Sequence, residues 1–306
     1  MHIAPLQQAL CADRSRVTAG PDPGCWLTPS LPAGWRLLGF HFFVDWRQTP
    51  PVVAERIWMT RQLRLDAAQN LQAVSDADIL RLFRADPASS EFADLERVCA
   101  LYGNQVSAIV LADIPVAEIT DETPLWVIAR PQAAELGIRR VPVRRLKEAI
   151  QEHSGGPVHV GSKGLTYGTS AVECYLSGSD AAFPGDADAV IVDERNRVRC
   201  VVEYKKHTLS APIDQHLVTD YYPRPDGRKY QRLAALAARY QRCLQQPVPL
   251  VVLYYSTKSP VIRLQEIGSL DANSVTISRD SGELSTCGRL PNAISDDVMR
   301  WLGMYS

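Results

Sequence analysis

Residues 183–207 constrain the fold of this chain most, because their pattern predicts a β-hairpin with charged side chains at one end. The segment is FPGDADAVIVDERNRVRCVVEYKKH. Residues 188–192 and 198–205 are mostly apolar, and 193–196 have turn composition, so two antiparallel strands are expected. A hairpin closed near Glu194 brings the start of the first strand opposite the end of the second. We therefore expect Asp188 to lie close to Glu203 and Lys205.

Strand alternation places the side chains of Glu203 and Lys205 on one face and those of Val202 and Tyr204 on the other. Carboxylates and an ammonium beside apolar runs are costly to bury unless they pair with each other or hold a cation. Mg²⁺ takes oxygen ligands, commonly one or two protein carboxylates, which fits Asp188 with Glu203. A metal there would activate water for attack on a phosphodiester, with Lys205 orienting or deprotonating that water. An ordinary ion pair of Glu203 with Lys205 at the sheet end is the alternative.

Asp188, followed by Glu203-Tyr204-Lys205 at the end of the next strand, resembles the signature of the PD-(D/E)xK nuclease superfamily. This family includes restriction endonucleases, Holliday-junction resolvases and recombination exonucleases. The resemblance covers the last half of the chain. It implies a restriction-endonuclease-like αβββαβ core with a central mixed sheet, preceded here by an N-terminal α/β region. It also implies that Asp188 and Glu203 bind Mg²⁺ or Mn²⁺ and that Lys205 positions the water.

Two further carboxylates are candidates for the same site. Glu173, on a helix expected from about Thr169 to Leu176, matches an additional acidic residue of many family members and is a candidate catalytic residue and metal ligand. A surface position on its helix is the alternative. Asp186 is an alternative to Asp188, which is preferred because it directly starts the apolar strand.

Candidate substrate-binding residues lie near the motif and on a helix expected from about Lys229 to Leu244. They are Lys206, Lys229, Gln231 and Arg232. The family often places a further active-site residue at the start of this helix, although Ala235 stands where some exonuclease-like members have Tyr. Arg232 belongs to an arginine-rich helix face, for which a solvated polar face is the alternative. Substrate contacts are also open for His207 and for the pair Tyr221 and Tyr222. For Lys206 and His207 the alternative is a cap at the strand end, and for the tyrosines it is a place in the core.

The chain is long enough for two domains, since it has 306 residues. Residues 152–164 are rich in Gly, Ser and Pro and are the predicted joint between region 1–154, of unknown role, and the nuclease-like domain 155–306. In the first region we expect a strand at 35–46, helices within 54–102, strands at 106–111 and 125–128, and a helix at 143–153. Its densest basic cluster indicates either a nucleic-acid contact or an exposed helix edge, and comprises Arg139, Arg140, Arg144, Arg145 and Lys147.

The net charge of −1 gives no global basic field, so any site for a polyanion must be local. The seven cysteines are scattered, odd in number and never spaced as CxxC, which predicts neither a disulfide framework nor a zinc ribbon and favours a reducing cytoplasm. The N-terminus lacks a signal-peptide pattern, and no apolar stretch approaches the ~20 residues of a membrane span. A cytoplasmic protein without membrane association is therefore expected.

The sequence thus predicts a metal-dependent nuclease, with DNA preferred over RNA on the family resemblance alone. A homodimer is compatible with double-strand cleavage. The main alternative is a catalytically inactive nuclease-fold module that binds or scaffolds. A second alternative, an unrelated α/β ligand-binding protein, predicts no metal at Asp188 and Glu203.

Overall fold

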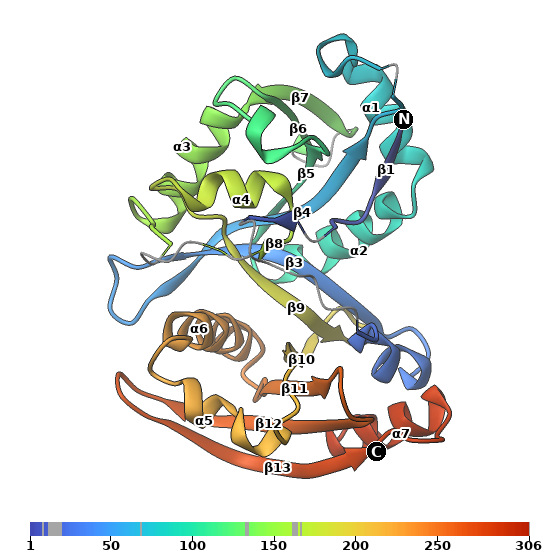
Figure 1. Ribbon diagram of the computed structural model, residues 1–306, viewed down its shortest axis with the longest axis vertical. Helices are drawn as coiled ribbons and strands as arrows, with labels where there is room; N and C mark the ends of the chain where they lie inside the picture. The colour runs from blue at the N-terminus through green and yellow to red at the C-terminus, as the bar shows by residue number, and fades with distance from the viewer. Residues whose placement is uncertain are drawn as a thin grey trace. The chain divides into compact units, whose positions relative to one another are not determined.

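The computed structural model describes residues 1–7, 9–11, 20–67, 69–131, 135–160, 165 and 167–305. The protein is α/β with a large mixed sheet (Figure 1). Its contacts divide the chain into two compact units, which are described separately. The first unit comprises Met1–Val17 and Phe40–Asp186, and the second comprises Thr18–Gly39 and Ala187–Ser306. No helix in the described ranges is long and apolar enough to cross a membrane.

In the first unit the strand order is β3-β4-β5-β6-β7, with β3 belonging to this unit from Phe40 onward and β1 paired to β4. The strands are β1 (His2–Ala4), β2 (Ala9–Leu10), β3 (Arg36–Asp45), β4 (Val52–Arg64), β5 (Gln105–Ala112), β6 (Pro124–Ala129), β7 (Gly137–Pro142) and β8 (Tyr167–Gly168). Only β4 and β5 pair in parallel among these described strands, and β2 pairs with β8 alone. The helices are η3 (Leu71–Ala73), α1 (Asp76–Ala85), α2 (Ala88–Leu101), η4 (Val116–Glu118), α3 (Val143–Ser154) and α4 (Ala171–Ser177). Strands β3, β5 and β6 and helices α3 and α4 confirm the predictions for their segments.

Strand β4 corrects the prediction that helical structure begins near residue 54. The strand lies between β3 and β5, and most of its residues from Ile57 to Leu63 are buried whichever face they occupy. A strand covered on both faces loses the alternation of apolar and polar residues, so its apolar positions also match helical spacing. The helical prediction is confirmed for α1 and α2, which follow later in the segment.

The predicted joint at 152–164 lies inside the first unit. Gly155 ends α3 in the left-handed conformation, with φ of 80°, and Gly156 donates its N–H to the carbonyl of Gln151 at 2.8 Å. Glycine is the common residue at such a helix terminus because it lacks a Cβ. The glycines here therefore end a helix. The chain passes between the two compact units after Val17, after Gly39 and after Asp186.

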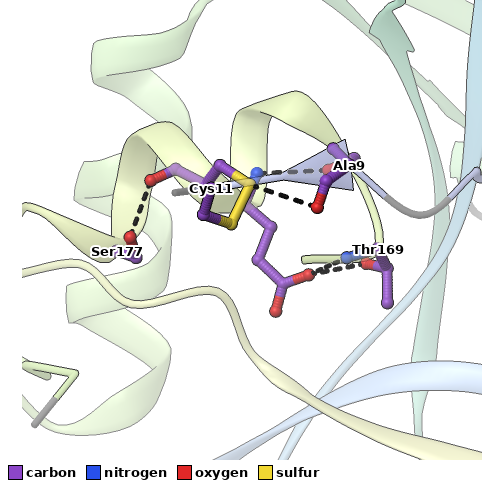
Figure 2. Close-up of a disulfide and its surroundings, with 7 residues drawn as sticks. Ala9, Cys11, Thr169 and Ser177 are labelled. Carbon is purple, nitrogen blue, oxygen red and sulfur yellow. Dashed lines mark hydrogen bonds between the residues drawn. A yellow bond between two sulfur atoms is a disulfide. The ribbon is translucent and has the colours of Figure 1, made fainter. Parts of the chain in front are cut away.

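Cys11 and Cys174 form a disulfide within the first unit, with their Cα atoms 5.0 Å apart (Figure 2). The bond attaches the chain just after β2 to helix α4, beside the pairing of β2 with β8. The prediction of no disulfide is therefore wrong. The two cysteines are 163 residues apart, so no local spacing could indicate their pairing.

Thiol titration tests this bond. The structure assigns free thiols to Cys25, Cys99, Cys200, Cys243 and Cys287. We expect five reactive thiols in denatured, unreduced protein and seven after reduction. In the native protein the exposed Cys243 and Cys287 should react first, because Cys200 is buried and burial raises the pKa of its thiol. Cys11→Ser serves as the control, since one removed cysteine leaves six thiols whether or not reductant is added. Seven thiols in unreduced wild-type protein would contradict the bond.

His41 is expected to make the stability of the first unit depend on pH. Its Nδ1 lies 3.0 Å from Thr60 Oγ1, and its ring contacts that of Phe183 edge to face. Burial lowers the pKa of His41, and the nearby Asp186 carboxylate offsets part of this effect. Because the pKa in the folded chain lies below the unfolded value of about 6.5, the unfolded chain binds more protons at acidic pH.

We therefore expect the free energy of unfolding to fall on acidification below about pH 6.5, by at most ~1.4 kcal/mol per pH unit from this group. Urea unfolding between pH 7 and pH 5 measures the slope. His41→Gln should reduce it, whereas His2→Gln, at an exposed position, should leave it unchanged. An identical slope in His41→Gln and wild type would refute this assignment.

In the second unit the strand order is β13-β12-β11-β10-β9. The strands are β9 (Gly185–Val192), β10 (Val198–His207), β11 (Leu250–Ser256), β12 (Val261–Leu270) and β13 (Val275–Ser285). Strands β10 and β11 are parallel, and the other neighbours are antiparallel. The helices are η1 (Pro23–Trp26), η2 (Thr28–Ser30), η6 (Ile213–Gln215), α5 (Val218–Tyr221), α6 (Gly227–Leu244) and α7 (Pro291–Trp301).

The predicted hairpin is confirmed as β9 and β10, and the helix and strands after it are confirmed as α6, β11 and β12. Helix α6 connects the parallel strands β10 and β11 and packs against both (Figure 1). Strand β13 and helix α7 were not predicted. Most residues of β13 are exposed or half-buried, so its sequence lacks the apolar run that marks a strand.

The sheet of the second unit buries one apolar cluster on each face. Val202 and Val251 belong to the cluster that includes residues of α7, whereas Val252 and Tyr254 belong to the cluster that includes residues of α5 and α6. This division follows from strand alternation. Side chains at the end of β10 therefore lie alternately on the face with the α7 cluster and on the face with the α5 and α6 cluster.

Candidate active site

The register of the hairpin brings Asp188 beside the end of β10. Val202 pairs with Ala189, and the backbone N–H of Tyr204 donates a hydrogen bond of 2.7 Å to Asp188 Oδ2. The Asp188 side chain is half-buried. The carboxylate is thus held next to the backbone that follows Glu203, the neighbourhood that the hairpin pattern predicts.

Glu203 is wholly buried, with no exposed surface. It is level with Val252 of β11, so it lies on the sheet face covered by α5 and α6. Its carboxylate forms an ion pair with Lys229 in the first turn of α6. A buried carboxylate stays ionised only beside a compensating cation, and Lys229 supplies one. The predicted substrate-binding residue Lys229 therefore contacts the predicted metal ligand.

Lys205 projects on the same face of β10 as Glu203 and pairs with a carboxylate that the sequence did not single out. Its ammonium forms an ion pair with Asp226 and lies 5.2 Å from the centre of the Tyr221 ring. Asp226 occupies the N-cap position of α6, yet its side chain makes no capping hydrogen bond. Asp226 could have been identified from its position, because it is a carboxylate at the start of the helix that follows the motif strand.

A pair of histidines extends the site beyond Tyr221. His216 Nδ1 lies 2.5 Å from the Tyr221 hydroxyl, and the rings of His216 and His207 are 4.7 Å apart. His207 Nε2 also lies 2.6 Å from the carbonyl oxygen of Ala211. His207 and Tyr221 were open candidates, whereas His216 was missed because its loop carries no recognisable pattern.

The other substrate-binding candidates, Gln231, Arg232 and Lys206, lie on α6 and β10. Gln231 Nε2 donates a hydrogen bond of 3.2 Å to the Tyr222 hydroxyl, and Arg232 is half-buried on α6. Lys206 follows Lys205 in β10, so alternation directs the two lysine side chains to opposite faces. Their roles in substrate binding stay predictions.

Glu173 lies in the first unit, where it caps helix α4. Ser170 is the N-cap residue, and its hydroxyl accepts a hydrogen bond of 3.1 Å from the Glu173 N–H. The Glu173 carboxylate in turn accepts hydrogen bonds from the Thr169 N–H and, at 2.8 Å, from the Thr169 hydroxyl (Figure 2). This reciprocal arrangement is similar to a capping box and accounts for Glu173 without a metal. Asp186 also belongs to the first unit.

The charged side chains at the end of β10 and the start of α6 form two ion pairs, Lys205 with Asp226 and Lys229 with Glu203, and Asp188 is held by the backbone N–H of Tyr204. The part of the chain that the structure describes contains no cluster of three or more His, Cys, Asp or Glu side chains suited to hold a metal ion. Two carboxylates nevertheless suit Mg²⁺, which usually retains several waters.

The fold and the site define an α/β protein whose second unit joins a β-hairpin, a crossover helix and a parallel strand around buried charge. Comparison of the chain with protein-family models, curated proteins and solved structures gives no match. Between α4 and α6 the described chain forms the two strands β9 and β10, whereas an αβββαβ order implies three. A function must therefore be argued from the site itself.

Proposed function

We propose that the second unit is a metal-dependent nuclease that hydrolyses phosphodiester bonds, with DNA preferred over RNA. The observation that carries this proposal is the wholly buried Glu203 carboxylate, beside the hairpin position that holds Asp188. Burial of a charged group is costly, and such groups concentrate at functional sites. Lys205 lies on the same strand face as Glu203. The site therefore contains the two carboxylates and the lysine that metal-dependent hydrolysis of a phosphodiester uses.

The donor set determines which metal the site would hold. Asp188 and Glu203 would bind Mg²⁺ or Mn²⁺ through carboxylate oxygens. The metal would supply an activated water and stabilise charge on the phosphate and leaving oxygen. A role for Glu173 as a further ligand rests on the family resemblance alone, because its carboxylate has a capping role in α4.

The chain's own cations would bind and orient the substrate. The Lys205 ammonium can donate hydrogen bonds to the attacking water or a phosphate oxygen, while Asp226 and the face of Tyr221 hold it in place. Lys229 neutralises Glu203 when no other cation is bound. Burial raises the pKa of the Tyr230 hydroxyl, so Tyr230 stays protonated in the apolar cluster that it shares with Val252 and Tyr254.

The topology supports a nuclease-like core in part. Strands β9 and β10 form the hairpin that carries Asp188 and Glu203, and α6 crosses over to β11, which is parallel to β10. These elements correspond to the last four of the six elements in the αβββαβ order. The restriction-endonuclease-like core is therefore proposed for the segment from β9 to β11.

An inactive nuclease-fold module that binds or scaffolds is the second candidate. It is favoured by the ion pairs of Lys205 with Asp226 and of Lys229 with Glu203, which would also satisfy a purely structural role. A cytoplasmic location and a homodimer are part of our proposal on sequence grounds only. The Cys11–Cys174 disulfide bears on the location, since reducing compartments disfavour such bonds.

A cleavage assay distinguishes the two candidates. The purified chain is incubated with supercoiled plasmid, single-stranded DNA and RNA in the presence of Mg²⁺. The proposal predicts cleavage of DNA that EDTA stops and excess Mg²⁺ restores. Cleavage that persists in EDTA would overturn the metal-dependent assignment, and no cleavage of any substrate would support the inactive module.

A further inference from the structure

A pocket in the first unit is lined by arginines and belongs to no site described above. Its volume is about 980 Å³, within the range of small-molecule pockets. It lies at the end of the sheet where β5 begins at Gln105 and where Ala129 of β6 pairs with Gly137 of β7. The second half of α2 contributes to its wall, and α2 packs on β5.

The charges around the pocket are strongly unbalanced. Arg56, Arg97, Arg130 and Arg139 line it, against a single carboxylate, Glu96. Arg130 lies 3.3 Å from Glu96, and Arg97 pairs with Asp94 on the same helix. Arg56 and Arg139 make no side-chain hydrogen bond or ion pair within the described ranges, although Arg56 is half-buried. Two guanidinium groups are therefore available to an anion.

The basic cluster predicted from the sequence includes Arg139, and its other members differ from Arg139 in having polar or acidic partners. Four of its five members have partners: Arg140 with Gln72, Arg144 with Glu122, Arg145 with Glu148, and Lys147 with Asp121. Only Arg139 of this cluster faces the pocket. The positive charge available to a ligand is thus concentrated there and not along α3.

We infer that this arginine pocket binds the phosphate of a nucleotide, either free or within a nucleic-acid strand. Guanidinium groups recognise phosphate through paired hydrogen bonds, and Arg56 and Arg139 are the groups free to do so. Val106, Val127 and Ile138 also line the pocket and offer apolar surface to a sugar or base. The volume exceeds what a lone phosphate requires. This inference does not depend on the proposed hydrolysis, because it is tested without metal.

Binding to the full chain is measured in EDTA with three probes: inorganic phosphate, 5′-AMP and a labelled short single-stranded oligonucleotide. We expect saturable binding of AMP or the oligonucleotide that is tighter than that of phosphate and weakens as salt is raised. The double variant Arg56→Ala/Arg139→Ala should weaken it by about ten-fold or more, since each loses a charge-assisted contact. Much tighter binding of the oligonucleotide than of AMP identifies a strand as the ligand, and equal binding identifies a free nucleotide.

The matched control is Arg144→Ala/Arg145→Ala, which removes the same charge from α3 and should change the affinity by less than about two-fold. Arg56→Lys, which retains the charge but loses the paired geometry, should give an intermediate affinity and guards against a folding defect. If the two double variants weaken binding equally, the ligand responds to the general positive charge of the unit and not to this pocket, and the inference is overturned. Phosphate binding as tight as AMP binding, or no saturable binding of any probe, would also overturn the inference.

Discussion

Asp188→Asn is expected to lower kcat/KM for DNA cleavage in Mg²⁺ by about a thousand-fold or more, because the metal loses one of its two proposed carboxylate ligands. Asparagine still offers an oxygen to the Tyr204 N–H, so the hairpin contact can persist while the charge is lost. Thermal unfolding of the same sample should show an almost unchanged Tm. A large loss of rate with an intact fold is the signature of a ligand.

The same assay includes one further site variant and one control. Lys205→Met should also reduce the rate strongly, since it removes the ammonium that orients water or phosphate. Glu194→Gln removes a carboxylate from the exposed turn of the same hairpin and should leave the rate unchanged. If Asp188→Asn cleaves DNA as fast as Glu194→Gln, Asp188 is not a ligand.

Lys229→Met is expected to destabilise the second unit by about 2–3 kcal/mol, because the wholly buried Glu203 loses its compensating ammonium. We place the cost below that of a fully buried pair because the Lys229 side chain is 39% exposed. Methionine keeps most of the aliphatic chain, so lost packing contributes little. Urea unfolding followed by a spectroscopic probe of the second unit gives the value.

A double-variant cycle shows whether the cost comes from the buried charge. Glu203→Gln in the Lys229→Met background should recover most of the lost stability, since no uncompensated carboxylate is left. Mg²⁺ should also stabilise Lys229→Met more than wild type, because a dication can replace the ammonium beside Glu203. Additive effects of the two substitutions, with no response to Mg²⁺, would contradict both statements.

The hairpin was predictable because its information is local. Alternation in β10 and the turn composition of 193–196 determine the pairing, and the register then places Asp188 near Glu203. Strand β4 was not predictable in the same way, since it is covered on both faces and lacks alternation. Likewise, the glycines after α3 have the composition of a linker whether they separate domains or end a helix.

The partners of the site residues depend on long-range contacts. Nothing in the motif indicates that Lys229 pairs with Glu203 or that Asp226 pairs with Lys205. The role of Glu173, in contrast, has a local signal, because Ser170 followed three residues later by Glu173 is a helix-start pattern. The Cys11–Cys174 bond has no signal short of the fold itself.

Anomalous scattering from a crystal soaked in Mn²⁺ tests the central claim most directly, because it locates the metal without relying on activity. We expect a peak bound by carboxylate oxygens of both Asp188 and Glu203, which disappears in Asp188→Asn. An ordered second unit with no peak at these carboxylates, or a peak that persists unchanged in Asp188→Asn, would contradict it.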